Sequence, residues 1–598
     1  MRSQLFLIVQ GLLIVDSLRR RLPPSLTSTD FLQDRVDPLH ELGLRINLEL
    51  PQVETVFIEN LPGDVLSLKA SFNQESDSSQ IVFTPAEKES DTDVIARVTL
   101  ERTRKRTGWD IVRCSIDTGL SNSNSTDAST PPSTPYPPPF PTTTPLPPSI
   151  TRAMYAAGWM EGWLTAEDIS SFFSKNGGQC RHEGFRQWLA NEYGGMVKKF
   201  LANGSSECSS ARSALGAFYA ESLGILDGYN NRKSSDSPGR QNNLDWLDVL
   251  CMNADSQLAE LWAVYQGESW VGTHCSAVVT LVETNSSVQL IAAHSTWEQP
   301  KLISMRVVKY WEFQLGGISA NFQLSTYPGF LSSSDDWIYA PGQLLATETS
   351  LGGQGTDLKG RSQSTAPDSI RVIASFLVAV LSETHSSTFS AYLTQCLPSR
   401  TYASQWLLLD LARFTESGMS STSILTLVET GGARPPVIED LTETLRVSKR
   451  VGSFNTRVSE SDDSPRFAIF DKFPAFTEVE SVAEFFWNQA IVSPFAGEGR
   501  NGAGDLKILS AIYGEEISEE SRGRGLHAVS AHETSCAWAG PPMRAGRSLA
   551  LEEVTKASDI SVDWENVEWL KMQGDDLACN ALNAQSKKLR IQAKTETW

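Results

Sequence analysis

Two short apolar runs joined by a polar turn place the strongest constraint on the fold of this chain. They lie in 275-CSAVVTLVETNSSVQLIAAH-294, where the runs span 277–282 and 288–293 and the first is rich in β-branched residues. This pattern predicts a β-hairpin with a thiol at the start of one strand and an imidazole at the end of the other. Because those two ends meet in an antiparallel pair, Cys275 and His294 are expected to be neighbours. The alternative interpretation is a buried structural cysteine and a core histidine, since cysteine is among the most often buried residue types.

Strand-like and helix-like stretches lie in separate blocks along the rest of the chain. Helical periodicity dominates residues 151–265, whereas strand-like runs precede and follow this block. Further strands are predicted at 94–100, 107–119, 306–315, 335–340 and 405–410, and helices at 185–201, 215–223, 369–383 and 477–488. Separate blocks of strands and helices indicate a layered α+β fold.

Composition limits the class of protein and of partner. A chain of 598 residues with 40% hydrophobic content can bury large cores. Its net charge of −20 argues against nucleic acid, which would require a basic surface. The eight cysteines show neither a Cys-x-x-Cys pair nor a Cys/His cluster at zinc spacing, so a structural metal site is not expected. No cofactor is expected either. Cys180 and Cys208, which flank a helical segment, are the best candidates for a disulfide, although spacing alone does not fix the pairing.

The first residues resemble a secretory signal peptide. Met1-Arg2 precedes a short apolar core over 5–15, which is too short to span a membrane, although three arginines at 19–21 are unusual after such a core. No later segment approaches the roughly 20 apolar residues of a membrane span. Glycosylation triplets occur at Asn124, Asn203 and Asn285 and are consistent with a secreted glycoprotein.

Several common catalytic motifs are absent from the sequence. There is no Gly-x-Ser-x-Gly elbow, no phosphate-binding Gly-x-x-x-x-Gly-Lys loop and no His-Glu-x-x-His, because His532-Glu533 lacks the second histidine. The adjacent carboxylates Asp335 and Asp336 lie beside a serine-rich turn, which favours a turn and cap over a paired acid site. Cys275 therefore remains the candidate nucleophile.

An ordered set of segments gives the chain a family resemblance. These segments are 155-YAAGWMEG-162, 224-GILDGY-229, 274-HCSAVV-279, 292-AAHSTW-297, 326-TYPGFLSSSDDW-337, 348-ETSLG-352, 401-TYASQWLLLD-410, 452-GSFNTR-457 and 487-WNQAIVSPF-495. In this order they resemble the motifs of the phospholipase B-like proteins, which include the lamina ancestor group. The resemblance covers roughly residues 108–535, and the ordered set is far more specific than any one segment.

The resemblance implies a fold and a chemistry. The family has the N-terminal-nucleophile hydrolase fold, a four-layer αββα sandwich, and its members act in lysosomes or outside the cell. Family precursors cut themselves before the cysteine, which here implies scission between His274 and Cys275. The new α-amino group, with a pKa of about 8, could then take the thiol proton. The two fragments are expected to remain associated, because the strand at 108–114 would join the same sheets as the later strands.

The resemblance also implies roles for residues around the nucleophile. His294 would bind or transfer a proton, and Trp297 would form a wall of the substrate pocket. Thr349, Asn455 and Asn488 match polar family positions, where a hydroxyl or an amide could stabilise an oxyanion. A structural role is an equal alternative for each of these residues.

The sequence also departs from the family pattern. Ala403 and Ser404 stand where the family has two asparagines, and Ala503 stands where it has an arginine. His274 replaces the family's serine at the scissile carbonyl. Inheritance of the fold is therefore better supported than inheritance of activity.

These features divide the chain into regions and define the expected function. The regions are a signal peptide (1–17), an N-terminal region of unassigned fold (18–106), the first strand of the hydrolase fold (107–119), a Pro/Ser/Thr-rich low-complexity insertion (120–150), a helical portion and pro-segment (151–274) and the nucleophile-bearing portion (275–598). We expect a hydrolase of acyl ester or amide bonds in lipids. The alternatives are a secreted glycoprotein with an impaired site that binds a lipid or a partner, and an amidase acting on N-acylated small molecules.

Overall fold

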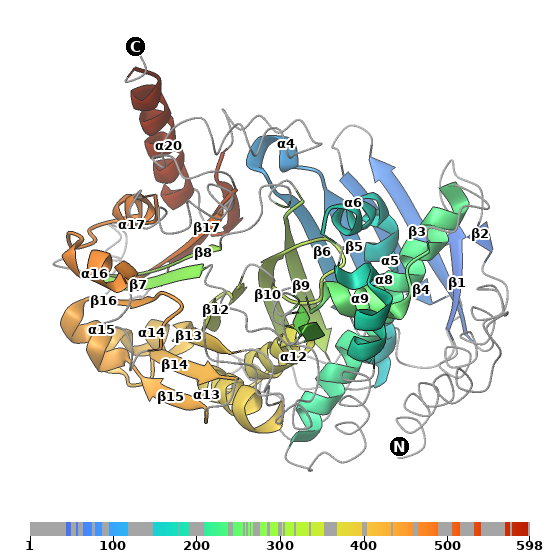
Figure 1. Ribbon diagram of the computed structural model, residues 1–598, viewed down its shortest axis with the longest axis horizontal. Helices are drawn as coiled ribbons and strands as arrows, with labels where there is room; N and C mark the ends of the chain where they lie inside the picture. Colours follow the sequence, from blue (N-terminus) through green and yellow to red (C-terminus); the bar gives the residue numbers. More distant parts are fainter. Residues whose placement is uncertain are drawn as a thin grey trace, which may run out of the picture.

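A computed structural model of the chain describes most of residues 95–117, 148–190, 208–266, 275–351, 368–457, 465–487, 505–514, 532–539 and 568–595, together with strands between 44 and 85 (Figure 1). Short gaps interrupt several of these ranges. The predicted signal peptide and Pro-rich insertion lie outside the described residues, and so do His274, Trp297, Asn488, Ala503 and the glycosylation triplets at Asn124, Asn203 and Asn285.

The described strands form two sheets. The larger sheet has 13 strands, in the spatial order β15 (Val437–Asp440), β14 (Leu425–Thr430), β13 (Ser404–Asp410), β12 (Leu344–Ser350), β11 (Trp337–Ala340), β10 (Ile318–Thr326), β9 (Val307–Leu315), β6 (Asp110–Asp117), β5 (Ile95–Glu101), β4 (Ser78–Pro85), β3 (Asp64–Asn73), β1 (Leu44–Glu49) and β2 (Val56–Phe57). The smaller has six, in the order β16 (Arg450–Ser453), β7 (Cys275–Glu283), β8 (Ser287–Thr296), β17 (Asp505–Gly514), β18 (His532–Ala539) and β19 (Leu570–Gln573). Neighbouring strands are antiparallel except in the pairs β1–β3 and β6–β9, which are parallel.

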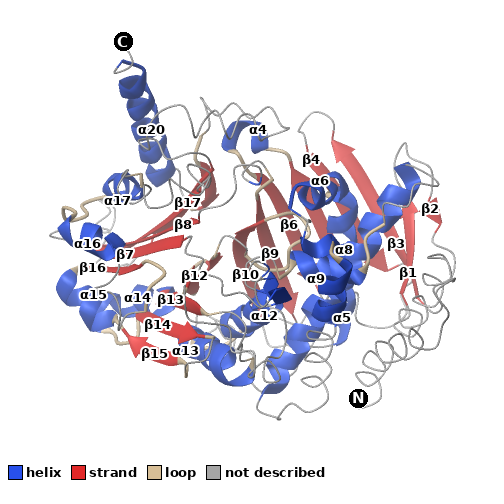
Figure 2. Ribbon diagram, viewed as in Figure 1, coloured by secondary structure: helices blue, strands red, loops and turns tan. Residues whose placement is uncertain are grey.

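Helices cover the outer faces of both sheets (Figure 2). The helices of the described part of the chain are α4 (Arg104–Thr107), α5 (Pro148–Leu164), α6 (Ala166–Asn176), α8 (Ser209–Asp236), α9 (Trp246–Met252), α12 (Asp368–Val380), α13 (His385–Ala391), α14 (Leu411–Ser417), α15 (Thr442–Ser448), α16 (Pro465–Lys472), α17 (Val479–Phe486) and α20 (Leu577–Thr595), with the short 3₁₀ helices η1 (Gln179–Arg181) and η5 (Gly418–Ser420) and the π-helix η4 (Tyr392–Cys396). None of the described helices is both long enough and apolar enough to cross a bilayer.

Two hydrophobic cores hold the layers together. In β12, Leu344 and Ala346 pack into a core with α5, α8 and α12, whereas Leu345 between them packs into a second core with the smaller sheet. This alternation follows from the two-residue period of a strand, which sends successive side chains to opposite faces. The second core also includes buried side chains of α16, α17 and α20. The order of layers is therefore helix, sheet, sheet, helix, and the predicted four-layer αββα fold is confirmed.

Glycines allow α5 and α8 to pack closely over the larger sheet. A Cβ atom built on Gly158 would lie 2.1 Å from the carbonyl oxygen of Glu221, and one on Gly224 would lie 2.0 Å from that of Tyr155. No side chain fits at such separations, so the two backbones are in direct contact. The segments YAAGWMEG and GILDGY, which contributed to the family resemblance, thus form one helix pair.

A buried charge cluster ties this helix pair to the sheet. The ammonium group of Lys309 on β9 lies 2.6 Å from a carboxylate oxygen of Glu161 on α5 and 2.5 Å from one of Glu221 on α8. Glu161 also accepts a hydrogen bond from the backbone N–H of Gly329 at 3.1 Å. Burial and the nearby Glu161 charge raise the pKa of Glu221 to about 8, although Lys309 opposes this shift. The cluster thus links α5, α8 and the segment around Gly329, and each of these carries one of the segments that resemble the family.

The structure corrects the predicted disulfide. Cys180 pairs with Cys251, not with Cys208, because η1 packs against α9 in a small separate core that contains both sulfur atoms. Cys208, just before α8, pairs with Cys396 at the end of η4. A third disulfide joins Cys536 of β18 to Cys579 of α20, and Cys114 and Cys275 are buried free thiols. The helical segment between Cys180 and Cys208 therefore does not bring these two cysteines together.

Candidate active site

The hairpin predicted around Cys275 is present and forms the centre of the site. Strand β7 begins at Cys275 and pairs with β8, so that Cys275 lies opposite Thr296 and Ala277 lies opposite His294. The thiol sulfur, a ring nitrogen of His294 and a carboxylate oxygen of Asp336 all lie within 4.8 Å of one another. The predicted proximity of the thiol and the imidazole is therefore confirmed.

Three groups hold Cys275 in place. Its thiol donates to Oδ2 of Asp336 at 3.1 Å, and its backbone N–H donates to Oδ1 of Asn455 at 3.1 Å. Its carbonyl oxygen accepts a hydrogen bond from Arg466 at 2.6 Å. Burial, followed by the negative charges of Asp336 and Glu348, raises the pKa of the thiol well above its usual value. A base or a positive charge is therefore needed to make this thiol an effective nucleophile.

Asp336 has a larger role than the turn and cap predicted from the sequence. It directly precedes β11 and has a φ of 56°, in the left-handed region that aspartate tolerates better than most residues. Its backbone carbonyl accepts the N–H of Glu348 on β12 at 3.1 Å, which fixes the turn while the side chain reaches the thiol. The adjacent Asp335 lies outside the described residues. The sequence showed two acids beside a turn but no sign that one of them faces Cys275.

Arg466 on α16 is a site residue that the sequence analysis missed. Its guanidinium group donates to the hydroxyl of Ser276 at 2.9 Å and to Oδ1 of Asn455 at 2.7 Å, in addition to the Cys275 carbonyl. Burial lowers the pKa of Arg466 to about 10, so it stays charged at any physiological pH. It thus supplies a fixed positive charge beside the head of β7.

Asn455 acts through its carbonyl oxygen. Because Oδ1 accepts from both Cys275 and Arg466, the other amide atom must be the nitrogen, which donates to the Ser350 carbonyl at 2.7 Å. This amide N–H group, the one that could stabilise an oxyanion, is therefore already engaged. The geometry places Asn455 as a partner of the Cys275 nitrogen.

His294 is a buried neutral imidazole. Nε2 lies 2.7 Å from the backbone carbonyl of Glu348, and since a carbonyl can only accept, Nε2 carries the proton and Nδ1 does not. Burial and the positive charge of Lys507 lower the pKa of His294 well below its usual value. Nδ1 faces the hydroxyl of Thr296 at 3.4 Å. His294 can therefore accept a proton only transiently.

Thr349 lies in a neighbouring polar network, and Ala403 and Ser404, two of the departures from the family pattern, lie beside it at the start of β13. The Thr349 hydroxyl is 2.5 Å from the hydroxyl of Ser453, which in turn contacts Gln405. Ser404 accepts a hydrogen bond from the Trp406 indole at 3.0 Å, and Ala403 is buried. The structure thus gives Thr349 a partner in the scaffold, and its predicted oxyanion role stays a prediction. Trp297 and Asn488 lie outside the described residues.

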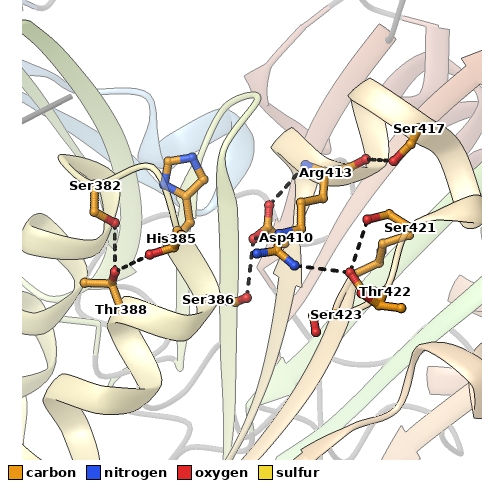
Figure 3. A network of polar contacts seen from close by, with 12 residues as sticks. Ser382, His385, Ser386, Thr388, Asp410, Arg413, Ser417, Ser421, Thr422 and Ser423 are labelled. Atoms are coloured by element: carbon orange, nitrogen blue, oxygen red, sulfur yellow. Dashed lines mark hydrogen bonds and ion pairs between the residues drawn. The ribbon is translucent and has the colours of Figure 1, made fainter. Parts of the chain in front are cut away.

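A second grouping of serine, histidine and aspartate does not form a catalytic triad. Figure 3 shows Ser386, His385 and Asp410, where the serine hydroxyl contacts the carboxylate at 3.3 Å. The ring of His385 instead bonds to the backbone carbonyl of Ala379 at 3.0 Å. Asp410 accepts the N–H of Arg413 and caps α14. The grouping therefore has a structural role.

The role of His294 can be tested with a matched histidine. If its role is chemical, His294→Ala should lower turnover by about 10²-fold or more with little change in melting temperature. His385→Ala is the control, because that ring is also buried and bonded to a backbone carbonyl but is not in the thiol cluster. If the two variants lose turnover to the same extent and also lose melting temperature to the same extent, His294 has a structural role in the core.

Comparisons with known proteins place the chain in a family. The family model described as Phospholipase B matches residues 145–460. Phospholipase B-like protein B of Dictyostelium discoideum is 25% identical over 33% of this chain and 36% of its own length. Human phospholipase B-like 1 is 29% identical over 27% of this chain and 28% of its own length. The alignments thus span about a third of those relatives.

Solved structures also show similarity to this chain, and one of them can be described. It is an N-acylethanolamine-hydrolyzing acid amidase ortholog from Caenorhabditis elegans, with 8% identity and a TM-score of 0.28, covering 41% of this chain and 96% of that one. These values are too low to establish a common fold. The family match is of a different kind, because it extends over more than half of the chain and includes both the helix pair and the hairpin that carries Cys275. The chain belongs to the phospholipase B family.

Proposed function

We propose that this protein is a hydrolase that cleaves acyl ester or amide bonds of lipids, with Cys275 as an N-terminal nucleophile released by self-scission. The observation that carries the proposal is the arrangement at the head of β7, where the thiol contacts a carboxylate and the backbone nitrogen contacts Asn455. A cysteine that served packing alone would not need a carboxylate beside its thiol.

Scission would begin with attack of the thiol on the preceding carbonyl. Asp336 is positioned to accept the thiol proton, and the sulfur then adds to the carbonyl carbon of His274. Collapse of this adduct breaks the C–N bond to Cys275, so the nitrogen gains a proton and becomes an amine while a thioester forms. Water then hydrolyses the thioester, leaving a carboxylate on His274 and a thiol on Cys275.

Turnover would reuse the same groups. The α-amine of Cys275, with a pKa of about 8, takes the thiol proton, and Asn455 accepts a hydrogen bond from that amine. The sulfur attacks the acyl carbonyl, the alcohol or amine leaves with a proton, and water releases the fatty acid from the acyl thioester. Arg466 orients this arrangement through its bonds to Cys275 and Asn455.

A panel of acyl esters and acyl amides, incubated with processed protein, tests the proposal and separates it from its alternatives. Release of fatty acid from phospholipid esters is the expected result. Preference for N-acylated small molecules would indicate an amidase. Intact scission without turnover of any substrate would indicate a lipid- or partner-binding protein.

The two fragments should be linked covalently as well as by packing. Cys208 precedes the scissile bond and Cys396 follows it, so their disulfide joins the two fragments, while β6 and β9 pair across the cut in the larger sheet. Denaturing electrophoresis should show one species without reductant and two with it. Cys396→Ser should separate the fragments without reductant, whereas Cys579→Ser should not, because the Cys536–Cys579 disulfide lies within the second fragment. Separate fragments in the unreduced natural protein would contradict this prediction.

We also propose that the protein acts in the lysosome or outside the cell. Three disulfides favour an oxidising compartment, and the raised pKa of Glu221 favours stability at acidic pH. Expression in eukaryotic cells should give a glycosidase-sensitive product without residues 1–17. An unshifted cytosolic product would exclude this location.

A further inference from the structure

The cluster at the head of β7 has the composition of a zinc site. Cys275, His294 and Asp336 come from β7, from β8 and from the turn before β11, and all three side chains are buried. Their potential ligand atoms lie within 4.8 Å of one another, the one such group of three among the described residues. The spacing rules applied to the sequence could not reveal this group, because its members are far apart along the chain.

The donor set suits zinc better than a hard cation. Thiolate, imidazole and carboxylate are the ligands of protein zinc sites, whereas magnesium and calcium prefer oxygen alone. The His294 ring is neutral, and its Nε2–H donates to the Glu348 carbonyl, which is the usual outer hydrogen bond of a metal-bound histidine. Nδ1, which carries no proton and lies 3.4 Å from the Thr296 hydroxyl, is the ring nitrogen with a lone pair to offer a metal.

The thiol and the carboxylate already lie close to the separation that zinc requires. Tetrahedral zinc with bonds of about 2.3 Å to sulfur and about 2.0 Å to oxygen holds those two ligands about 3.5 Å apart. Cys275 Sγ and Asp336 Oδ2 are 3.1 Å apart, with the thiol proton between them. Zinc would take the place of this proton, which is released to solvent on binding.

Scission would supply a fourth ligand. The nitrogen of Cys275 is an amide before the cut and a primary amine after it, and an amine and thiolate on one residue close a five-membered chelate ring. We propose that the processed site binds one Zn²⁺ through the Cys275 amine and thiolate, His294 and Asp336, and that zinc reversibly inhibits the enzyme. The fourth ligand and the inhibition rest on the function proposed above, whereas the three side-chain ligands do not.

Cobalt(II) tests the site without relying on activity, because thiolate bound to cobalt gives a charge-transfer absorption band. Chelator-treated full-length protein should bind one cobalt ion with this band, and zinc should displace it. Cys275→Ala should lose the band, and Asp336→Asn should weaken binding at least about 10-fold. Cys114→Ala is the matched control, because it removes the other buried free thiol and should retain the band. Turnover should fall as zinc binds and return on adding chelator.

The outcomes separate the metal site from the proposed function. A protein that cuts itself and hydrolyses substrate, yet shows no thiolate–cobalt band, would overturn the zinc site and leave the function standing. Undiminished cobalt binding by Cys275→Ala would also overturn it. A band in a chain that neither cuts itself nor turns over substrate would support the three-residue site while the proposed function fails, and no band in that chain would overturn both.

Discussion

Replacing Cys275 with alanine is expected to abolish both scission and turnover while leaving the fold intact. A methyl group cannot attack a carbonyl, and loss of the nucleophile lowers turnover by a factor on the order of 10⁶ in acyl-transfer enzymes of comparable design. The side chain is small and buried, so its truncation removes little packing. Fatty acid release and melting temperature, measured on the same preparation, check the prediction.

Two controls define what this result means. Cys275→Ser should slow scission without abolishing it, because a hydroxyl is harder to deprotonate than a thiol. Cys114→Ala removes the other buried free thiol, on β6, and should leave turnover unchanged. Residual turnover in Cys275→Ala at the natural rate would show that the chemistry lies elsewhere in the protein.

Replacing Lys309 with methionine should cause the largest loss of stability. The change leaves Glu161 and Glu221 buried without the ammonium group that both contact. Removal of one partner from a buried charge cluster costs about 3–5 kcal/mol, a large part of a typical unfolding free energy of about 5–15 kcal/mol. Denaturant unfolding at neutral pH measures this loss, and Arg232→Met, on the same helix pair but half-exposed, should cost far less.

The charge cluster also predicts a pH dependence. Because the pKa of Glu221 is raised to about 8 from its ordinary value near 4.5, the folded state holds this proton more tightly than the unfolded state. The stabilisation is complete below pH about 4.5 and is lost as pH rises through about 8. Glu221→Gln should therefore reduce the fall in stability between acidic and mildly alkaline pH. An unchanged pH profile in this variant would show that Glu221 is not the responsible group.

The sequence predicted correctly those strands and helices whose local residue pattern is typical of the element they form. Alternating and β-branched runs predicted the hairpin of β7 and β8 and the strand β13, and helical periodicity predicted α12 and α17. The proximity of Cys275 and His294 followed from the antiparallel hairpin alone. The four-layer arrangement required the family resemblance, since period and composition do not determine how sheets stack.

What the sequence could not predict depends on contacts between distant segments. Asp336 and Arg466 reach Cys275 across 61 and 191 positions of the chain. Neither residue lies in a pattern that distinguishes a site residue from an ordinary turn aspartate or helix arginine. The same limit explains the disulfide error, because Cys208 and Cys396 meet across 188 positions through the packing of α8 against the helices near η4.

Intact-mass analysis of the reduced and deglycosylated protein tests the central claim most directly. After incubation at acidic pH, the account predicts two masses, one for a fragment that ends at His274 and one for residues 275–598 beginning Cys-Ser-Ala-Val. Cys275→Ala should give one uncut chain under the same conditions. A single uncut chain from the natural protein, identical in behaviour to the alanine variant, would contradict the self-scission mechanism.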